Sequence, residues 1–309
     1  MIPGYALQRI LTGGLNRTSS RLGYPRCSPD RQDEYVGDAL RQWREQLEAW
    51  AIPKRITVAV ADSPWAVPTE VFARRADHYT AAPTGPSYER AIEALAPSGT
   101  VLDVGAGAGA ASLPLAPRAS ELIAVDSKPS MLDALTQRSA RLGLPTRPIV
   151  GRWPDVAGET PIADIVVCHH VFYNAPDLDA FALALSTHAR RRVVVELTRA
   201  HPMRVLNPLW RMFHDLDRPV GPTVADAVAV LGEVGVAPHA VEWRRPPRPE
   251  YGSFEALVSI TRQRLCLPPD RDGELADALI GLGVDPAHPR DLGASGDDLT
   301  TLWWEPDPR

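Results

Sequence analysis

The chain has 309 residues, of which 44% are hydrophobic and 23% charged, so it is long enough for one large domain with additions or for two small domains. Its net charge of -5 argues against a large nucleic-acid interface, which normally shows as a basic face. No apolar run approaches the roughly 18 residues of a membrane span, and three widely spaced cysteines give neither a disulfide framework nor a zinc spacing.

The first 85 residues are predicted to form an extension followed by a helical lobe. Residues 1–29 hold four arginines and no acidic residue, and we expect them to form a poorly ordered extension. Residues 38–50 predict an amphipathic helix, and a second helical piece is expected at 71–77. We therefore assign residues 30–85 to an N-terminal helical lobe.

Residues 86–309 alternate between strands and helices. Such alternation predicts an α/β fold with a parallel sheet and right-handed crossovers. The expected strands are 100–104, 121–126, 147–151, 163–168, 191–197, 239–243 and 299–304, and the expected helices between them are 110–117, 129–142, 176–189 and 223–235.

Two long connections interrupt this alternation, at 199–221 and 245–298. Long connections in a compact domain usually carry function or form lids, so we expect both insertions to form a lid. In the first insertion an aromatic stripe has helical spacing and is predicted to wall the substrate pocket. This stripe consists of Trp210, Phe213 and His214.

The most informative stretch is residues 101–126. Its first strand carries Asp103 near its end, a glycine-rich loop and a helix follow, and the second strand ends in Asp126. Glycines without Cβ atoms let the chain turn sharply and let a ligand lie against backbone, while the helix N-terminus points at that ligand. Asp126 stands where a ribose-binding acid is expected. The stretch therefore predicts a nucleoside-binding crevice.

The glycines alone fit two cofactor classes, because GAGAGA also satisfies the loose dinucleotide pattern. Asp103 discriminates between them, since a carboxylate at this place would repel a pyrophosphate and attract an ammonium group. The stretch resembles the D-x-G-x-G-x-G motif of class I S-adenosylmethionine-dependent methyltransferases, in particular the bacterial small-molecule type. The matching residues are Asp103, Gly105, Gly107, Gly109 and Asp126.

This resemblance implies a doubly wound Rossmann-like sheet with strand order 3-2-1-4-5-7-6, in which the last strand is antiparallel. It implies S-adenosylmethionine as cofactor and S-adenosylhomocysteine as product, with Ser127 beside the ribose-binding Asp126. The family commonly has an adenine-binding acid after the third strand, where this chain has Arg152. We therefore expect adenine to be held by backbone amides, by Trp153 packing on the ring, or by Asp155.

Catalytic candidates follow the fourth strand, in CHHVFYNAPD. Methyl transfer needs mainly positioning, but a general base helps when the acceptor is a hydroxyl or a protonated amine. His170, Tyr173 and His169 are the candidates, and His169 is also a candidate for cofactor contact. Neighbours on a strand point to opposite sides, so only one histidine is expected to face the crevice. The family often has histidine where this chain has Tyr173, which is expected either to shape the pocket or to orient the acceptor.

The sequence as a whole predicts methyl transfer to an O, N or C centre of a small metabolite. A cytoplasmic protein is expected, with no metal, nucleic-acid or membrane partner, and a homo-oligomer is possible. Two alternatives stay open. One is an NAD(P)-dependent oxidoreductase with the same first βαβ unit, and the other is a non-catalytic cofactor-binding sensor or assembly protein.

Overall fold

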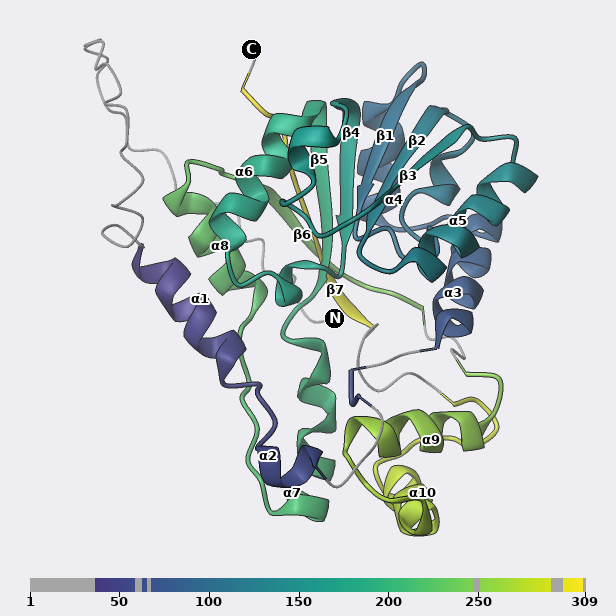
Figure 1. The fold of residues 1–309 in the computed structure, drawn as a ribbon, viewed down its shortest axis with the longest axis vertical. Coiled ribbons are helices and arrows are strands. Elements are labelled where there is room, and N and C mark those ends of the chain that lie inside the picture. Colours follow the sequence, from purple (N-terminus) through teal and green to yellow (C-terminus); the bar gives the residue numbers. More distant parts are fainter. Residues whose placement is uncertain (1–36, 59–62, 66–67, 247–250, 290–296, 308–309) are drawn as a thin grey trace, which may run out of the picture. The chain divides into compact units, whose positions relative to one another are not determined.

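A computed structural model describes residues 37–307 except 59–62, 66–67, 247–250 and 290–296 (Figure 1). The predicted extension at residues 1–29 lies outside the described residues. Among the residues that are described, no helix combines the length and the apolar character that crossing a bilayer demands.

One seven-stranded sheet forms the centre of the fold, in the order β3-β2-β1-β4-β5-β7-β6. Strands β1 to β5 pair in parallel, whereas β7 runs antiparallel to both β5 and β6. The predicted strand order and the reversed last strand are confirmed. The strands are β1 (Gly99–Val104), β2 (Ala119–Asp126), β3 (Thr146–Val150), β4 (Ala163–His169), β5 (Ala189–Thr198), β6 (His239–Arg244) and β7 (Asp298–Trp304).

Helices cover both faces of this sheet, as its apolar central strands require (Figure 1). In one group, α4 and α5 pack on strands of the sheet and α3 packs on α5. In the other group, α8 packs on both α1 and α6. Their bounds are α1 (Asp38–Glu48), α3 (Thr69–Ala81), α4 (Pro86–Ala94), α5 (Pro129–Arg141), α6 (Leu178–His188) and α8 (Val224–Glu233). Helix α4 has no counterpart in the sequence prediction.

The predicted helix at 110–117 is wrong. This stretch forms turns and one short 3-10 helix, η1 (Leu113–Leu115). Pro114 and Pro117 have no amide hydrogen to donate, and a proline also disfavours the α conformation of the residue before it. The glycine-rich loop is therefore followed by turns and by η1, where the sequence predicted an α-helix.

The two insertions fold together. Helix α7 (Asn207–His214) from the first packs with α9 (Phe254–Arg264) and α10 (Asp272–Gly281) from the second, around a shared hydrophobic cluster. The one-turn helix α2 (Lys54–Thr57) adds Ile56 to this cluster. We call α2, α7, α9 and α10 the insertion bundle.

Helix α1 is fastened to both α8 and the turn after β4. The Glu233 carboxylate of α8 accepts hydrogen bonds from the backbone amides of Ala39 and Leu40, at 2.8 and 3.1 Å, and so caps the start of α1. The fully buried Trp43 donates from Nε1 to the Ala175 carbonyl at 2.9 Å. Its ring also stacks on Tyr173, with ring centres 5.7 Å apart. Helix α1 therefore supports the segment that follows β4.

We expect the Trp43→Ala change to lower the free energy of unfolding by about 3–5 kcal/mol, because it opens a cavity and leaves the Ala175 carbonyl without its donor. Urea denaturation followed by circular dichroism measures this loss. Met212→Ala on α7 is the control, since that side chain is 59% exposed. Equal stability of the two variants would show that α1 does not hold this region together.

Candidate functional site

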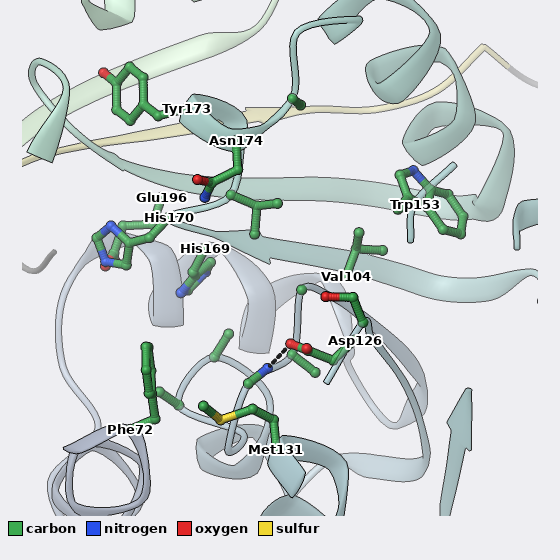
Figure 2. Close-up of a pocket in the computed structure, with 18 of the residues that line it drawn as sticks. Phe72, Val104, Asp126, Met131, Trp153, His169, His170, Tyr173, Asn174 and Glu196 are labelled. Atoms are coloured by element: carbon green, nitrogen blue, oxygen red, sulfur yellow. Dashed lines mark hydrogen bonds and ion pairs between the residues drawn. The ribbon is translucent and has the colours of Figure 1, made fainter. Parts of the chain in front are cut away.

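A cavity of about 980 Å³ lies over the carboxyl ends of β1, β2 and β4. Its size is at the upper end of the roughly 300–1,000 Å³ typical of ligand pockets, enough for more than one bound molecule. Helix α3 and the turn after β4 also contribute to its walls (Figure 2). The structure brings together these predicted site residues: Gly105, Gly107, Asp126, Ser127, Arg152, Trp153, His169, His170 and Tyr173.

Asp126 joins the loop after β1 to the turn after β2. Its Oδ2 accepts the backbone N–H of Gly107 at 2.8 Å (Figure 2). Its Oδ1 accepts the backbone N–H of Lys128 at 2.9 Å. A carboxylate offers about four acceptor positions, so each oxygen keeps one for a further donor. Asp126 is therefore fixed in place and still able to accept hydrogen bonds from hydroxyl groups in the cavity.

The three glycines of the loop have different roles. Gly105 has a φ of +72°, and a Cβ there would lie 2.4 Å from Val171 Cγ2, so this position packs tightly against the turn after β4. Gly107 has a φ of +52°, and a Cβ there would meet nothing within 4 Å. Gly109 does not line the cavity; a Cβ at this residue would press on Leu113. Gly107 is thus the glycine that presents bare backbone to the open space.

Asp103 does not line the cavity, which corrects the expectation that its charge faces a bound ammonium group. Side chains alternate along a strand, and the next residue, Val104, reaches the cavity instead. Asp103 is 1% exposed and accepts a hydrogen bond from Ser112 Oγ at 2.5 Å. Burial raises the pKa of Asp103 to about 7, although the Ser112 bond opposes this. Asp103 therefore organises the loop from inside the fold.

One side of the cavity is formed by the segment after β3. Trp153 is held by α6, since its Nε1 donates to the Phe181 carbonyl at 3.3 Å and its ring meets the His188 ring edge-on at 4.9 Å. Asp155 lines the cavity beside Trp153, and the exposed Arg152 does so too. This side offers an aromatic surface and a carboxylate.

Both histidines at the end of β4, His169 and His170, line the cavity, which corrects the expectation that only one of them would. Strand β4 ends at His169, and His170 has a φ of +60°, so the alternation of a strand does not continue. Nε2 of His169 is buried and has no hydrogen-bond partner among the described residues. Burial lowers the pKa of His169 to about 4, which keeps its ring neutral near pH 7.

His170 is paired with a carboxylate on the neighbouring strand. Its Nε2 lies 3.1 Å from Oε1 of Glu196, which is on β5 and 6% exposed (Figure 2). The Arg245 guanidinium lies 3.9 Å from the same oxygen and donates to the Tyr79 hydroxyl. Burial lowers the pKa of His170, while Glu196 opposes this shift. Burial raises the pKa of Glu196, but the neighbouring histidines and Arg245 outweigh it, so the pKa lies below its usual range.

Tyr173 has a structural role here, and this corrects its place among the catalytic candidates. Its hydroxyl donates to the Thr198 carbonyl at 2.8 Å, and its ring stands 5.7 Å from both the Trp43 and the His201 rings. Burial raises the pKa of Tyr173. With its proton committed to a carbonyl, Tyr173 shapes the wall of the cavity and does not act as a base.

The predicted aromatic wall lies elsewhere. Trp210, Phe213 and His214 do not line the cavity; the first two pack inside the insertion bundle, and His214 Nε2 lies 2.6 Å from the Leu265 carbonyl oxygen. Helices α9 and α10 cover the apolar face of α7, which its sequence alone could not show. From the same insertion, His201 and Met203 face the cavity instead.

Sequence reasoning missed an entire wall of the cavity. Phe72, Arg75 and Tyr79 of α3 line it together, and their spacing of three and four residues is the signal that they share one helix face. Glu196 also had a signal, as an acidic residue near the carboxyl end of the apolar strand β5. The buried Arg264 of α9 also lines the cavity, but no sequence pattern indicated it.

A comparison with known protein families gives a match that covers many of the site residues. Residues 101–191 match a family described as a methyltransferase domain. The matched stretch includes the glycine loop, Asp126 and both histidines, so this part of the chain is similar to a methyltransferase domain. A segment of 103 residues is 33% identical to an uncharacterized protein of Haemophilus influenzae, and the match spans 33% of this chain and 38% of that protein.

The solved structures that match this chain differ widely from it in sequence. The YcgJ protein of Bacillus subtilis matches with a TM-score of 0.48 at 17% identity, over 71% of this chain and 97% of its own. A cyclopropane-fatty-acyl-phospholipid synthase-like protein of Lactobacillus casei gives 0.49 at 15% identity, over 84% and 98%. Magnesium protoporphyrin IX methyltransferase of Synechocystis, solved with S-adenosylhomocysteine bound, gives 0.41 at 20% identity, over 68% and 94%.

The raised pKa of Asp103 leads to a prediction about stability. A carboxyl whose pKa is about 7 when folded, against 3.8 ordinarily, stabilises the fold while protonated and loses that contribution as pH rises through 7. Relative to wild type, Asp103→Asn should therefore gain about 3 kcal/mol between pH 5 and pH 8, since the change occurs over the roughly two units from pH 5 to 7 at about 1.4 kcal/mol per unit. Urea unfolding at the two pH values measures the gain.

Asp133→Asn, which removes an exposed carboxylate on α5, serves as the control and should follow wild type at both pH values. If Asp103→Asn also follows wild type, Asp103 is ionised in the folded protein and the account of its burial is wrong.

Proposed function

We propose that this protein transfers a methyl group from S-adenosylmethionine to an O, N or C centre of a small molecule bound in the cavity beside His170. The observation that carries the proposal is the fixed Asp126 carboxylate, held by the amides of Gly107 and Lys128 next to bare backbone that faces open space. A nucleoside with free ribose hydroxyls suits this arrangement.

The residues around the cavity fit the cofactor. Asp126 would accept hydrogen bonds from the ribose hydroxyls, and Gly107 would let the nucleoside approach the backbone. Trp153 and Met131 offer apolar surface for the adenine ring. His169 Nε2, which has no partner among the described residues, is available to a polar group at the methionine end. When bound, the cofactor supplies an already activated methyl group.

The remaining work of the protein is to position the acceptor, to exclude water and to accept a proton. His170 lines the cavity with a lowered pKa, so its ring is a neutral base near pH 7. Glu196 would stabilise the positive charge that the ring gains when it takes a proton. Such a base serves an acceptor that must lose a proton, as a hydroxyl or a protonated amine does.

The acceptor end of the cavity favours a small molecule with an apolar body. Phe72 and Tyr79 of α3 line it, together with Met203 and His201 from the first insertion. Pockets of this kind combine apolar and aromatic walls with a few polar groups that fix orientation. The net charge of -5 and the buried free cysteines Cys168 and Cys266 support a small-molecule substrate and a reducing, cytoplasmic location.

The oxidoreductase alternative is less well supported. Dinucleotide-binding sites place the pyrophosphate at the N-terminus of the helix that follows the glycine loop. In this protein turns and η1 follow that loop.

Asp126→Ala tests the proposal through binding of S-adenosylhomocysteine, the product. Removing the carboxylate takes away charge-assisted hydrogen bonds to the ribose, worth about 1.5–3 kcal/mol together, and leaves the amides of Gly107 and Lys128 without their acceptor. Isothermal titration calorimetry should therefore show affinity reduced by roughly 10- to 100-fold.

Asp133→Ala, which removes an exposed carboxylate from α5, is the matched control and should bind like wild type. Equal affinity of the Asp126→Ala protein would show that the ribose does not lie at Asp126. A wild-type protein that binds NADH but not S-adenosylhomocysteine would overturn the proposed function altogether.

A further inference from the structure

Glu196 contacts His170 through both its side chain and its backbone. The carboxylate lies 3.1 Å from the ring nitrogen Nε2, and the Glu196 carbonyl accepts the backbone N–H of His170 at 2.7 Å. Glu196 is 6% exposed, so this pairing takes place away from bulk water. A buried charge is costly unless it is paired, so the position of Glu196 is set by its partners.

The backbone of His170 is itself unusual. Its φ of +60° lies in the left-handed region, which few residues other than glycine adopt. Residues held in such conformations cluster at functional sites, where the surrounding structure fixes them. The bond from the His170 N–H to the Glu196 carbonyl is part of what fixes this one, and it points the ring toward the carboxylate of the same residue.

We infer that Glu196 is a positioning residue that holds His170 as the neutral Nε2–H tautomer, which leaves the Nδ1 lone pair available to take a proton in the cavity. A carboxylate only accepts hydrogen bonds, so the ring nitrogen that faces it carries the hydrogen. No hydrogen bond to Nδ1 of His170 is made by the described residues, and His170 lines the cavity. That this proton comes from the methyl acceptor is a premise that rests on the proposed function.

The proton step is balanced within this pair. The O–H or N–H bond of the acceptor breaks, the proton bonds to Nδ1, and the electron pair stays on the acceptor atom. The ring then carries a positive charge next to the Glu196 carboxylate, which stabilises it. The proton returns to water after the product leaves.

Several charges around His170 decide its protonation state. From β5, Glu196 favours the charged ring. Burial and the cations Arg245, after β6, and Arg75, on α3, favour the neutral ring, and His169 is its neighbour on β4. Arg245 also lies 3.9 Å from the Glu196 carboxylate, so it helps to keep that group ionised. The ring is therefore neutral before the reaction and has its counter-charge in place.

Nuclear magnetic resonance of the full chain labelled with ¹⁵N-histidine tests the inference without any cofactor. The signals of His170 are identified by their loss in a His170→Asn protein. In wild type near pH 7 we expect a neutral ring with the hydrogen on Nε2. In Glu196→Gln the midpoint of the ring titration should move to lower pH by about one unit, because the negative partner is gone. Glu196→Asp should restore part of the shift.

A second, independent variant tests the effect of a positive charge near His170. Arg245→Met removes a cation, so the midpoint of the His170 titration should move to higher pH. A general loosening of the site would not move this midpoint in opposite directions in the Glu196 and Arg245 variants. Glu242→Gln, which removes an exposed carboxylate from β6, is the control and should leave the titration unchanged. A ring with its hydrogen on Nδ1, or a midpoint that Glu196→Gln leaves in place, overturns the inference.

The outcome is separate from that of the proposed function. If wild type does not bind S-adenosylhomocysteine in calorimetry, the proposed function fails, but the resonance data still decide whether Glu196 positions His170. If wild type binds S-adenosylhomocysteine and the His170 titration is the same in wild type and Glu196→Gln, only the positioning role fails.

Discussion

β1 has β2 on one side and β4 on the other, so the segments that leave these strands diverge and open a crevice at their carboxyl ends. The rest of the site depends on this reversal of strand order. The glycine loop follows β1, Asp126 ends β2, and His169 ends β4 with His170 directly after it, so one edge of the sheet brings them together. Residues about 65 positions apart in the sequence thereby share one cavity.

Electrostatics differ between the two sides of this cavity. Around Asp126, backbone amides fix a carboxylate that can still accept hydrogen bonds, which suits a neutral diol. Around His170, a buried carboxylate and a buried guanidinium surround a ring whose pKa is lowered. Such a balance costs stability, because each of these charges is removed from water. A function in which the ring gains and loses a proton explains why the fold would keep it.

The strands could be predicted because their signals are local and repeated along the chain, although the strand order and the reversed β7 came from a family resemblance. Gly107 and Asp126 were predictable for the same reason, since neighbouring parallel strands fix where they lie. Trp210 was misplaced because an amphipathic helix does not reveal which surface will cover it. The turn at His170 leaves no trace in the sequence, so the alternation rule failed there. Glu196 could have been noticed as an acid in an apolar strand.

The central claim is that a nucleoside lies across the end of β2 with its reactive end toward the turn after β4. A crystal structure of the protein with S-adenosylhomocysteine tests it most directly. The account predicts ribose hydroxyls within hydrogen-bond distance of the Asp126 carboxylate and the sulfur atom on the side of the cavity that holds His170 and Glu196. A ribose bound away from Asp126, or a sulfur that faces Trp153, would contradict it.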